Sequence, residues 1–140
     1  RTVAEAARVV RPGGTVAACT FEESGFTLAR IFWQAALRFD PAAPNDARLP
    51  FRRSEELRGL WSRAGLRDVE SGVIDLEGAY TGFDDFWGPF AFGVGPPGGY
   101  LVAQPEDRRE EIRDACYEIL GRPAGAFSLP ARALAIRGRT

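Results

Sequence analysis

Hydrophobic residues recur along the chain at spacings that switch between those of helices and those of strands. The clearest helical stripe is formed by Leu57, Leu60 and Trp61. In the same segment Ser54 is placed to cap a helix, and Gly65 can supply the left-handed residue that ends one. The pattern therefore predicts a helix between these last two residues.

The remaining segments alternate between helical and strand-like patterns. Helices are predicted over residues 1–10, 26–39, 83–92 and 105–120, strands over 15–21, 69–76 and 127–137, and loops over 40–50 and 93–99. The run 15–21 is apolar on both faces, which is typical of a strand in an α/β sheet covered on both sides. Three strands are few for such a sheet, which usually holds five or six.

Composition narrows the class of protein without naming it. The 140 residues suffice for one domain, and 45% of them are hydrophobic against 26% charged, as in an ordinary globular protein. The net charge of −1 provides no field that would attract nucleic acid or a membrane surface, and no apolar run reaches the roughly 18 residues of a membrane span. We therefore expect neither nucleic acid nor a membrane as a partner.

Three residue types are absent. The chain has no Met, which suggests a fragment or a processed chain, and all 18 of its basic residues are Arg, a bias that a GC-rich bacterial genome would produce. It also has no His, the commonest general base and metal ligand. Cys19 and Cys116 both follow apolar patterns, so we predict two buried free thiols, no metal site and a cytoplasmic location.

Four segments together resemble a known family. They are RVVRPGGTVAACTF, LRGLWSRAGLRDVESG, FDDFWGPF and FSLPARALAIRGR, and they look like the second half of a class I, S-adenosylmethionine-dependent methyltransferase of the type 11 or UbiE-like branch. The resemblance implies an α/β fold with a partial Rossmann-like sheet and covering helices. Residues 15–21, 69–76 and 127–137 would be strands five, six and seven, with the last strand antiparallel beside its neighbours.

The resemblance also implies what this chain lacks. In the family, S-adenosylmethionine is held mostly by a glycine-rich loop after strand one and an acidic residue ending strand two, and neither has a counterpart here. No residue inherits a cofactor role, so we expect little or no cofactor binding by this chain alone. The whole chain would be the C-terminal part of one methyltransferase domain, with residues 26–50 and 81–104 as substrate-side insertions.

The predicted function is accordingly the C-terminal half of a methyltransferase that acts on a small molecule, inactive without its N-terminal half. The alternative is a non-catalytic binding or oligomerisation module derived from the same fold. A dehydrogenase half is weaker still, because Lys and His are absent.

Several aromatic residues are candidates for a substrate pocket. Phe83, Trp87, Phe90 and Tyr100 could form an apolar wall, since ligand pockets are largely apolar and aromatic. Packing against the sheet or against another chain is the simpler explanation, because aromatic residues at helical spacing are more often core than pocket. Phe21 is predicted to end its strand at the edge where open α/β sheets bind ligands, with Glu22 and Glu23 on the following loop. This position makes Phe21 a candidate wall of the substrate pocket.

Asp84 and Asp85 are the one pair of carboxylates in an aromatic setting. A raised pKa would let either act as a general base. The simpler interpretation is that one carboxylate caps a short helix and the other is solvated.

The segment GVGPPG, residues 93–98, matches a phosphate-binding glycine pattern by letter alone. Pro96 and Pro97 lack the N–H groups that a phosphate would need, so a loop is the expected structure.

The strand at 15–21 has no charged side chain to block edge pairing. We therefore expect its outer edge, where a fourth strand would lie, to be covered by a homo-oligomer or by the missing N-terminal half.

Overall fold

The computed structural model describes residues 2–44 and 50–140. The chain divides into two compact units. The first comprises Arg1–Phe26, Ala47–Leu76 and Arg132–Thr140, and the second comprises Thr27–Asp46 and Glu77–Ala131. Both segments predicted as insertions fall mainly in the second unit, and their role on the substrate side stays a prediction.

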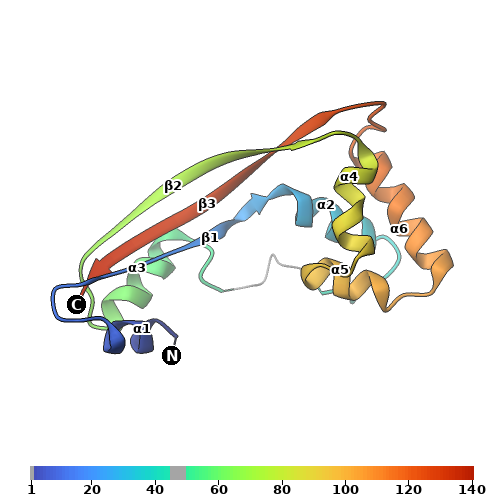
Figure 1. Ribbon diagram of the computed structural model, residues 1–140. Coiled ribbons are helices and arrows are strands. Elements are labelled where there is room, and N and C mark those ends of the chain that lie inside the picture. The colour runs from blue at the N-terminus through green and yellow to red at the C-terminus, as the bar shows by residue number, and fades with distance from the viewer. Residues whose placement is uncertain (1, 45–49) are drawn as a thin grey trace. The chain divides into compact units, whose positions relative to one another are not determined.

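A three-stranded sheet is the framework of the first unit, although residues 77–80 and 127–131 of its strands are assigned to the second. Its strands are β1 (Thr15–Phe26), β2 (Arg67–Tyr80) and β3 (Phe127–Arg139), in the order β1-β3-β2. Figure 1 shows that β3 runs between the other two strands and opposite to both. The prediction that the first and last strands are antiparallel neighbours is therefore confirmed.

Two helices cover one face of this sheet, α1 (Thr2–Val9) and α3 (Ser54–Arg63). Leu57 and Trp61 of α3 pack on Leu134 and Ile136 of β3, as the helical stripe predicted. Val16 of β1 completes this buried centre, since alternate strand residues point to the same face.

The ends of α3 match the sequence pattern only in part. Gly65 has a φ of 83°, the left-handed conformation expected after the helix. Ser54 was expected to cap the helix, but it is the first helical residue and the N-cap is Arg53, without a side-chain cap. The Ser54 hydroxyl instead lies 2.8 Å from the Ser71 hydroxyl on β2.

The opposite face of the sheet carries small side chains and is not covered by any described residue of this unit. Ala17 and Cys19 on β1 are exposed, and a shallow apolar hollow of about 530 Å³ lies over them, Gly72 and Ala135. The expectation that this strand is covered on both faces is wrong for the described chain. Cys19 is correspondingly exposed, whereas Cys116 is buried as predicted.

Strand β1 is longer than the apolar run predicted. It continues to Phe26, so Glu22 and Glu23, which were placed on a loop, belong to the strand. The polar segment stays in the strand because Gly25 allows a close approach: a Cβ added there would overlap the Arg132 carbonyl oxygen.

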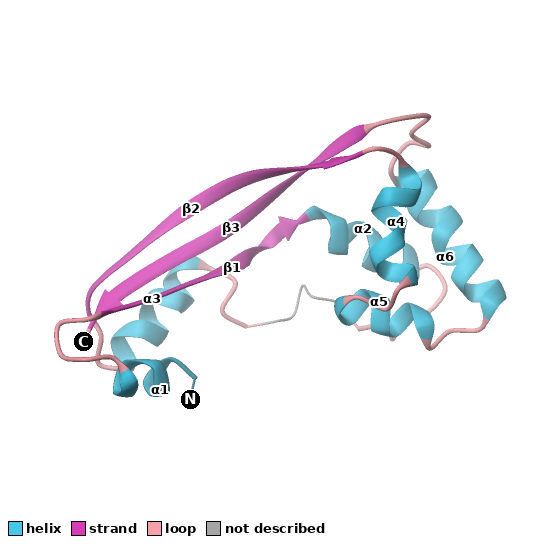
Figure 2. Cartoon of the chain, in the orientation of Figure 1, coloured by secondary structure: helices cyan, strands magenta, loops and turns pink. Residues whose placement is uncertain are grey.

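Four helices form the second unit (Figure 2): α2 (Thr27–Ala36), α4 (Phe83–Ala91), α5 (Gly95–Val102) and α6 (Glu106–Ile119). Helix α2 packs on α6, and α4 packs on α5. The side chains buried most completely here are Phe32, Phe86, Phe90, Leu101, Ile112 and Cys116. An aromatic and aliphatic core therefore holds these helices together.

Helix α5 corrects the loop predicted for residues 93–99. It begins at Gly95, and its two prolines occupy the first turn. Prolines are tolerated there because the first N–H groups of a helix have no partner within it. Within residues 2–44 and 50–140, no helix has both the length and the apolar character needed to cross a membrane.

Substituting Gly25 tests the close approach of β1 to β3. The Gly25→Ala variant should lower the free energy of unfolding by about 1–3 kcal/mol, because the new methyl group meets the backbone of Arg132, which cannot move aside. Chemical denaturation followed by circular dichroism measures the change.

Gly72→Ala on β2 is the matched control, since nothing lies within 4 Å of its added Cβ. Equal stability of the two alanine variants would contradict the close approach.

Candidate functional site

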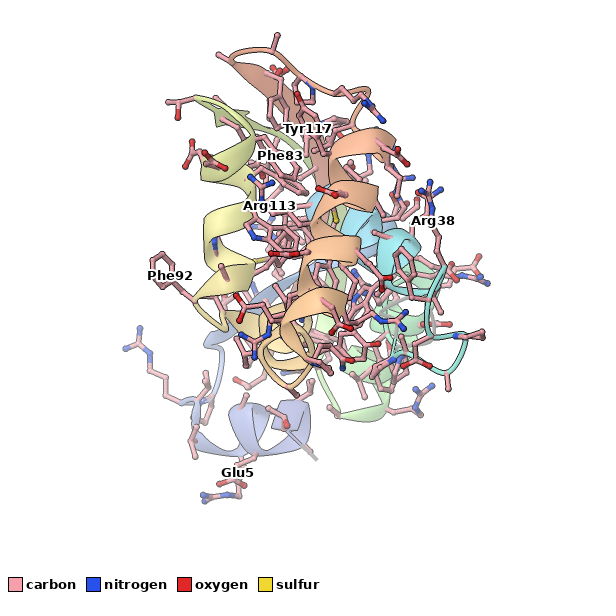
Figure 3. The ribbon with its side chains drawn as sticks, turned by 90° about the vertical axis from the view of Figure 1, so that its right-hand side faces the viewer. Glu5, Arg38, Phe83, Phe92, Arg113 and Tyr117 are labelled. Carbon is pink, nitrogen blue, oxygen red and sulfur yellow. The ribbon has the colours of Figure 1, made fainter. Side chains whose placement is uncertain are left out.

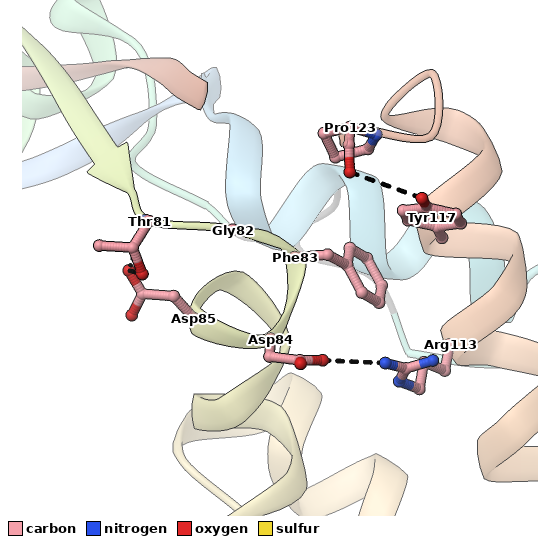
Figure 4. A pocket seen from close by; sticks show the side chains of 8 residues that line it. All are labelled: Thr81, Gly82, Phe83, Asp84, Asp85, Arg113, Tyr117 and Pro123. Carbon is pink, nitrogen blue, oxygen red and sulfur yellow. Dashed lines mark hydrogen bonds and ion pairs between the residues drawn. The ribbon is translucent and has the colours of Figure 1, made fainter. Parts of the chain in front are cut away.

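The candidate site is an open pocket of about 440 Å³ in the second unit, where α4 begins beside α6. Figure 4 shows its lining, which consists of Thr81, Gly82, Phe83, Asp84, Asp85, Arg113, Tyr117 and Pro123. It contains three residues singled out in the sequence, Phe83 and the two carboxylates. It also contains Arg113 and Tyr117, which the sequence analysis missed.

Arg113 is the cation of this pocket. Its Nη2 lies 2.9 Å from Oδ1 of Asp84, and the centre of its guanidinium lies 5.0 Å from the centroid of the Phe83 ring. A cation over an aromatic face is attracted by the ring quadrupole. Two contacts from the first turn of α4 therefore hold a side chain of α6.

Tyr117 is one helical turn from Arg113 and packs against the same ring. Its ring centroid is 4.9 Å from that of Phe83, in an edge-to-face arrangement. Its hydroxyl donates to the Pro123 carbonyl oxygen over 3.5 Å, a long hydrogen bond. Figure 3 shows Phe83, Arg113 and Tyr117 directed toward one another between the two helices.

Asp85 points away from this group and serves the start of α4. Its Oδ2 accepts hydrogen bonds from the backbone N–H of Thr81 at 2.9 Å and from the Thr81 hydroxyl at 3.2 Å. One carboxylate thus supports the helix start, close to the simpler interpretation, although the N-cap is Gly82. Asp84 is exposed, yet it is paired with Arg113.

The aromatic candidates of the second unit lie in one cluster. The Phe90 ring is 4.8 Å from that of Phe32 and is only 1% exposed, and the half-buried Trp87 packs on both Phe83 and Phe90. Of these candidates, Phe83 is the one that also lines the described pocket. Substrate contact by the others stays a prediction.

Tyr100 is held by a hydrogen bond from its hydroxyl to Oδ2 of Asp40, 2.9 Å away. Its ring packs edge-on against Trp33, with 5.5 Å between centroids. Burial, followed by the hydrogen bond and the charge of Asp40, raises the pKa of Tyr100 to about 12. This residue stabilises the contact between α5 and the segment after α2.

Phe21 belongs to the first unit and does not end its strand, contrary to expectation. Its ring stacks on Phe26 with 4.0 Å between centroids. Its carbonyl oxygen accepts a hydrogen bond from Nε of Arg52 at 3.1 Å, and Nη2 of the same guanidinium lies 3.2 Å from the Glu22 carbonyl oxygen. Its role as a pocket wall stays a prediction.

The glycine pattern at 93–98 has a structural explanation. Gly93 and Gly95 adopt φ values of 76° and 67°, and an added Cβ at Gly98 would collide with the Gly93 backbone. These glycines allow the sharp turn from α4 into α5. With Pro96 and Pro97 beside them, they form no cradle for a phosphate.

At the glycine-rich turn, Pro96 and Pro97 lack the N–H donors that a ligand would need there. At the apolar hollow of the sheet, the carboxylate of Glu70 is paired with Arg137 at 2.7 Å. Cofactor binding by this chain stays a prediction. Across residues 2–44 and 50–140, no group of His, Cys, Asp and Glu is arranged to hold a metal ion.

Comparisons with known proteins add little. No protein-family model matches the chain, and no curated protein does. Among solved structures it is similar to a protein of Bacillus halodurans C-125 described as a "putative methyltransferase", with 13% identity and a TM-score of 0.43. The alignment covers 98% of this chain and 55% of the other, so the chain spans about half that protein's length. At this identity and TM-score the likeness assigns no activity or ligand to the chain.

Alkaline titration tests the Tyr100–Asp40 contact. In an absorbance titration the pKa of Tyr100 should be about 12, and Asp40→Asn should lower it, because the charged acceptor that opposes deprotonation is gone. Since the folded pKa is raised, the stability from this contact is complete below the unfolded pKa of about 10 and is lost as the pH rises to about 12.

Tyr100→Phe is the control, which should remove this high transition from the titration curve. An unchanged curve for Asp40→Asn would show that the hydrogen bond does not form.

Proposed function

We propose that this chain is the C-terminal half of an S-adenosylmethionine-dependent methyltransferase that acts on a small molecule. The observation that carries the proposal is the position of the last strand: β3 lies antiparallel between β1 and β2. The family that the sequence resembles has its last strand antiparallel beside its neighbours. The proposal therefore rests on the order and direction of the strands, which agree with those that the resemblance implies.

The position of the helices supports the same proposal. Helix α3 lies between β1 and β2 in the chain, directly before β2, and covers the face on which Leu134 and Ile136 of β3 lie. Helices packed on a sheet between successive strands are the general arrangement of α/β folds. The segments between these strands then supply the pocket at the start of α4.

The cofactor is proposed to be held mainly by an N-terminal half, because the resemblance places the glycine-rich loop and the acidic residue of the cofactor site there. This half-chain would contribute the substrate side. A methyl acceptor that is already nucleophilic needs chiefly to be positioned, so the absence of His is compatible with the proposal. A role for Asp84 or Asp85 as a base stays a prediction.

A second candidate function is a non-catalytic assembly module, which one observation favours. Among the described residues, none pairs with the outer edge of β1 from Thr15 to Thr20, whereas Arg52 lies against the next residues, Phe21 and Glu22. An uncharged open edge invites another strand. Both functions therefore expect a partner here, either an N-terminal half or a second copy of this chain.

Calorimetric titration with S-adenosylmethionine tests the proposed division of labour. The 140-residue chain should give no saturable heat at cofactor concentrations up to about 1 mM, whereas a longer chain carrying the N-terminal half should bind at about micromolar concentration. Micromolar binding by the short chain would show that the cofactor site is misplaced. Absence of binding by the longer chain would favour the assembly module.

Light scattering tests whether the open edge is covered by a second copy. The chain alone should exceed its monomer mass of 15.3 kDa, and Ala17→Arg on β1 should shift it toward monomer, because charged side chains on an edge strand oppose pairing.

Ala126→Arg is the matched control, since Ala126 is an exposed loop residue of the second unit. A wild-type monomer that unfolds cooperatively would contradict association through this edge.

A further inference from the structure

The ion pair between Asp84 and Arg113 lies at an open pocket and is accessible from solvent. The side chain of Asp84 is 90% exposed and that of Arg113 is 41% exposed. Exposed ion pairs contribute little to stability, so a ligand can enter this pair at little cost to the fold. The stability of the fold therefore does not explain why this ion pair is present.

Arg113 is oriented for recognition of an anionic group. The Phe83 ring supports the guanidinium at 5.0 Å, and Phe83 itself is buried under Trp87 and Tyr117. Its hydrogen bond to Asp84, the one that the described part of the chain gives it, uses one of its five N–H donors. The remaining donors form the planar fork that matches a carboxylate.

Asp84 supplies the complementary charge. One of its oxygens contacts Arg113, and among the described residues no donor contacts the other. An ammonium group could bind that second oxygen while the first stays near the arginine. The long hydrogen bond of Tyr117 leaves its hydroxyl available as a further polar contact.

The charges of the pocket select among ligands. Asp84, Asp85 and Arg113 give it a net charge of −1. A simple anion on Arg113 would lie beside the Asp84 carboxylate, and a simple cation on Asp84 would lie beside the guanidinium. A ligand that carries both charges on adjacent atoms meets each group with its opposite, and an apolar body can lie along the Phe83 and Tyr117 rings in about 440 Å³.

We propose that this pocket binds a zwitterionic α-amino acid with an apolar side chain, its carboxylate on Arg113 and its ammonium on Asp84. This inference does not depend on the proposed function, because binding requires neither a cofactor nor an N-terminal half. The residues that carry it all belong to the second unit.

Ligand-observed NMR and calorimetry on the 140-residue chain test this proposal with three probes that share one ring. They are L-phenylalanine, 2-phenylethylamine, which lacks the carboxylate, and 3-phenylpropanoate, which lacks the ammonium. L-phenylalanine should bind at about millimolar concentration, and each singly charged probe should bind at least about tenfold more weakly. The proposal is overturned if either singly charged probe binds as tightly, or if none saturates by about 20 mM.

Two variants locate the binding. Arg113→Gln and Asp84→Asn should each weaken L-phenylalanine binding about tenfold. Arg113→Gln should remove its preference over 2-phenylethylamine, which lacks the carboxylate, and Asp84→Asn should remove its preference over 3-phenylpropanoate, which lacks the ammonium. Asp84→Asn changes a nearly fully exposed side chain, so it remains informative even if Arg113→Gln perturbs the fold.

Arg8→Gln is the control, because Arg8 also forms an exposed ion pair, with Glu5 in the first unit. Unchanged affinity in Asp84→Asn, or an equal loss in Arg8→Gln, would place the ligand elsewhere.

Discussion

The pairing of β3 with both β1 and β2 is the interaction on which the first unit depends. The two outer strands do not pair with each other, so the sheet exists only when the last strand lies between them. The C-terminal residue strengthens this arrangement: Thr140 donates to the Gly14 carbonyl oxygen at 3.0 Å and accepts from the Gly13 N–H at 3.3 Å. The turn before β1 is thus held by the residue that directly follows β3.

The same pairing gives the side chains of β3 two kinds of contact, apolar packing on the helices and ion pairs with β2. Leu134 and Ile136 face the helices and are buried, whereas Arg132 and Arg137 pair with Asp75 and Glu70 on β2 at 2.6 and 2.7 Å. These ion pairs are exposed, and such pairs contribute about 0–1 kcal/mol each. The buried residues set the register, since a slip by one residue would turn the apolar side chains to the other face.

The elements that the sequence predicted well are those with a strong local pattern. The stripe of Leu57 and Trp61 marks α3, and the glycine at 65 ends it, because both signals act within a few residues. Helix α5 was missed because its glycines and prolines are those of a loop, and its core contact, Leu101, is one residue among them.

The full length of β1 was not predicted from the sequence, for a different reason. What keeps residues 22–26 extended is the close approach of Gly25 to Arg132, more than 100 residues later in the chain, which no local pattern contains.

Only some of the residues that line the pocket could be predicted from the sequence. Asp84 and Phe83 stand out there because a carboxylate pair lies among aromatic residues. Arg113 and Tyr117 lie on the exposed-looking, charged helix α6, and only the packing of α4 against it assigns them a partner. A spacing of four residues puts both on one face of that helix, but this spacing alone does not say what the face contacts.

Phe83 connects the core of the second unit with its polar surface. One part of its environment is the aromatic cluster, where Phe86 and Trp87 fix the ring, and the other is the guanidinium of Arg113. Because the ring cannot move without disturbing the core, the cation on it is held in place before any ligand arrives. Binding then does not have to order a long, flexible side chain, whose immobilisation would otherwise cost about 0.5–1.5 kcal/mol. Arg8, paired with Glu5 on an exposed helix, has no such aromatic support, so an arginine–carboxylate pair makes a recognition site only where packing has already fixed its geometry.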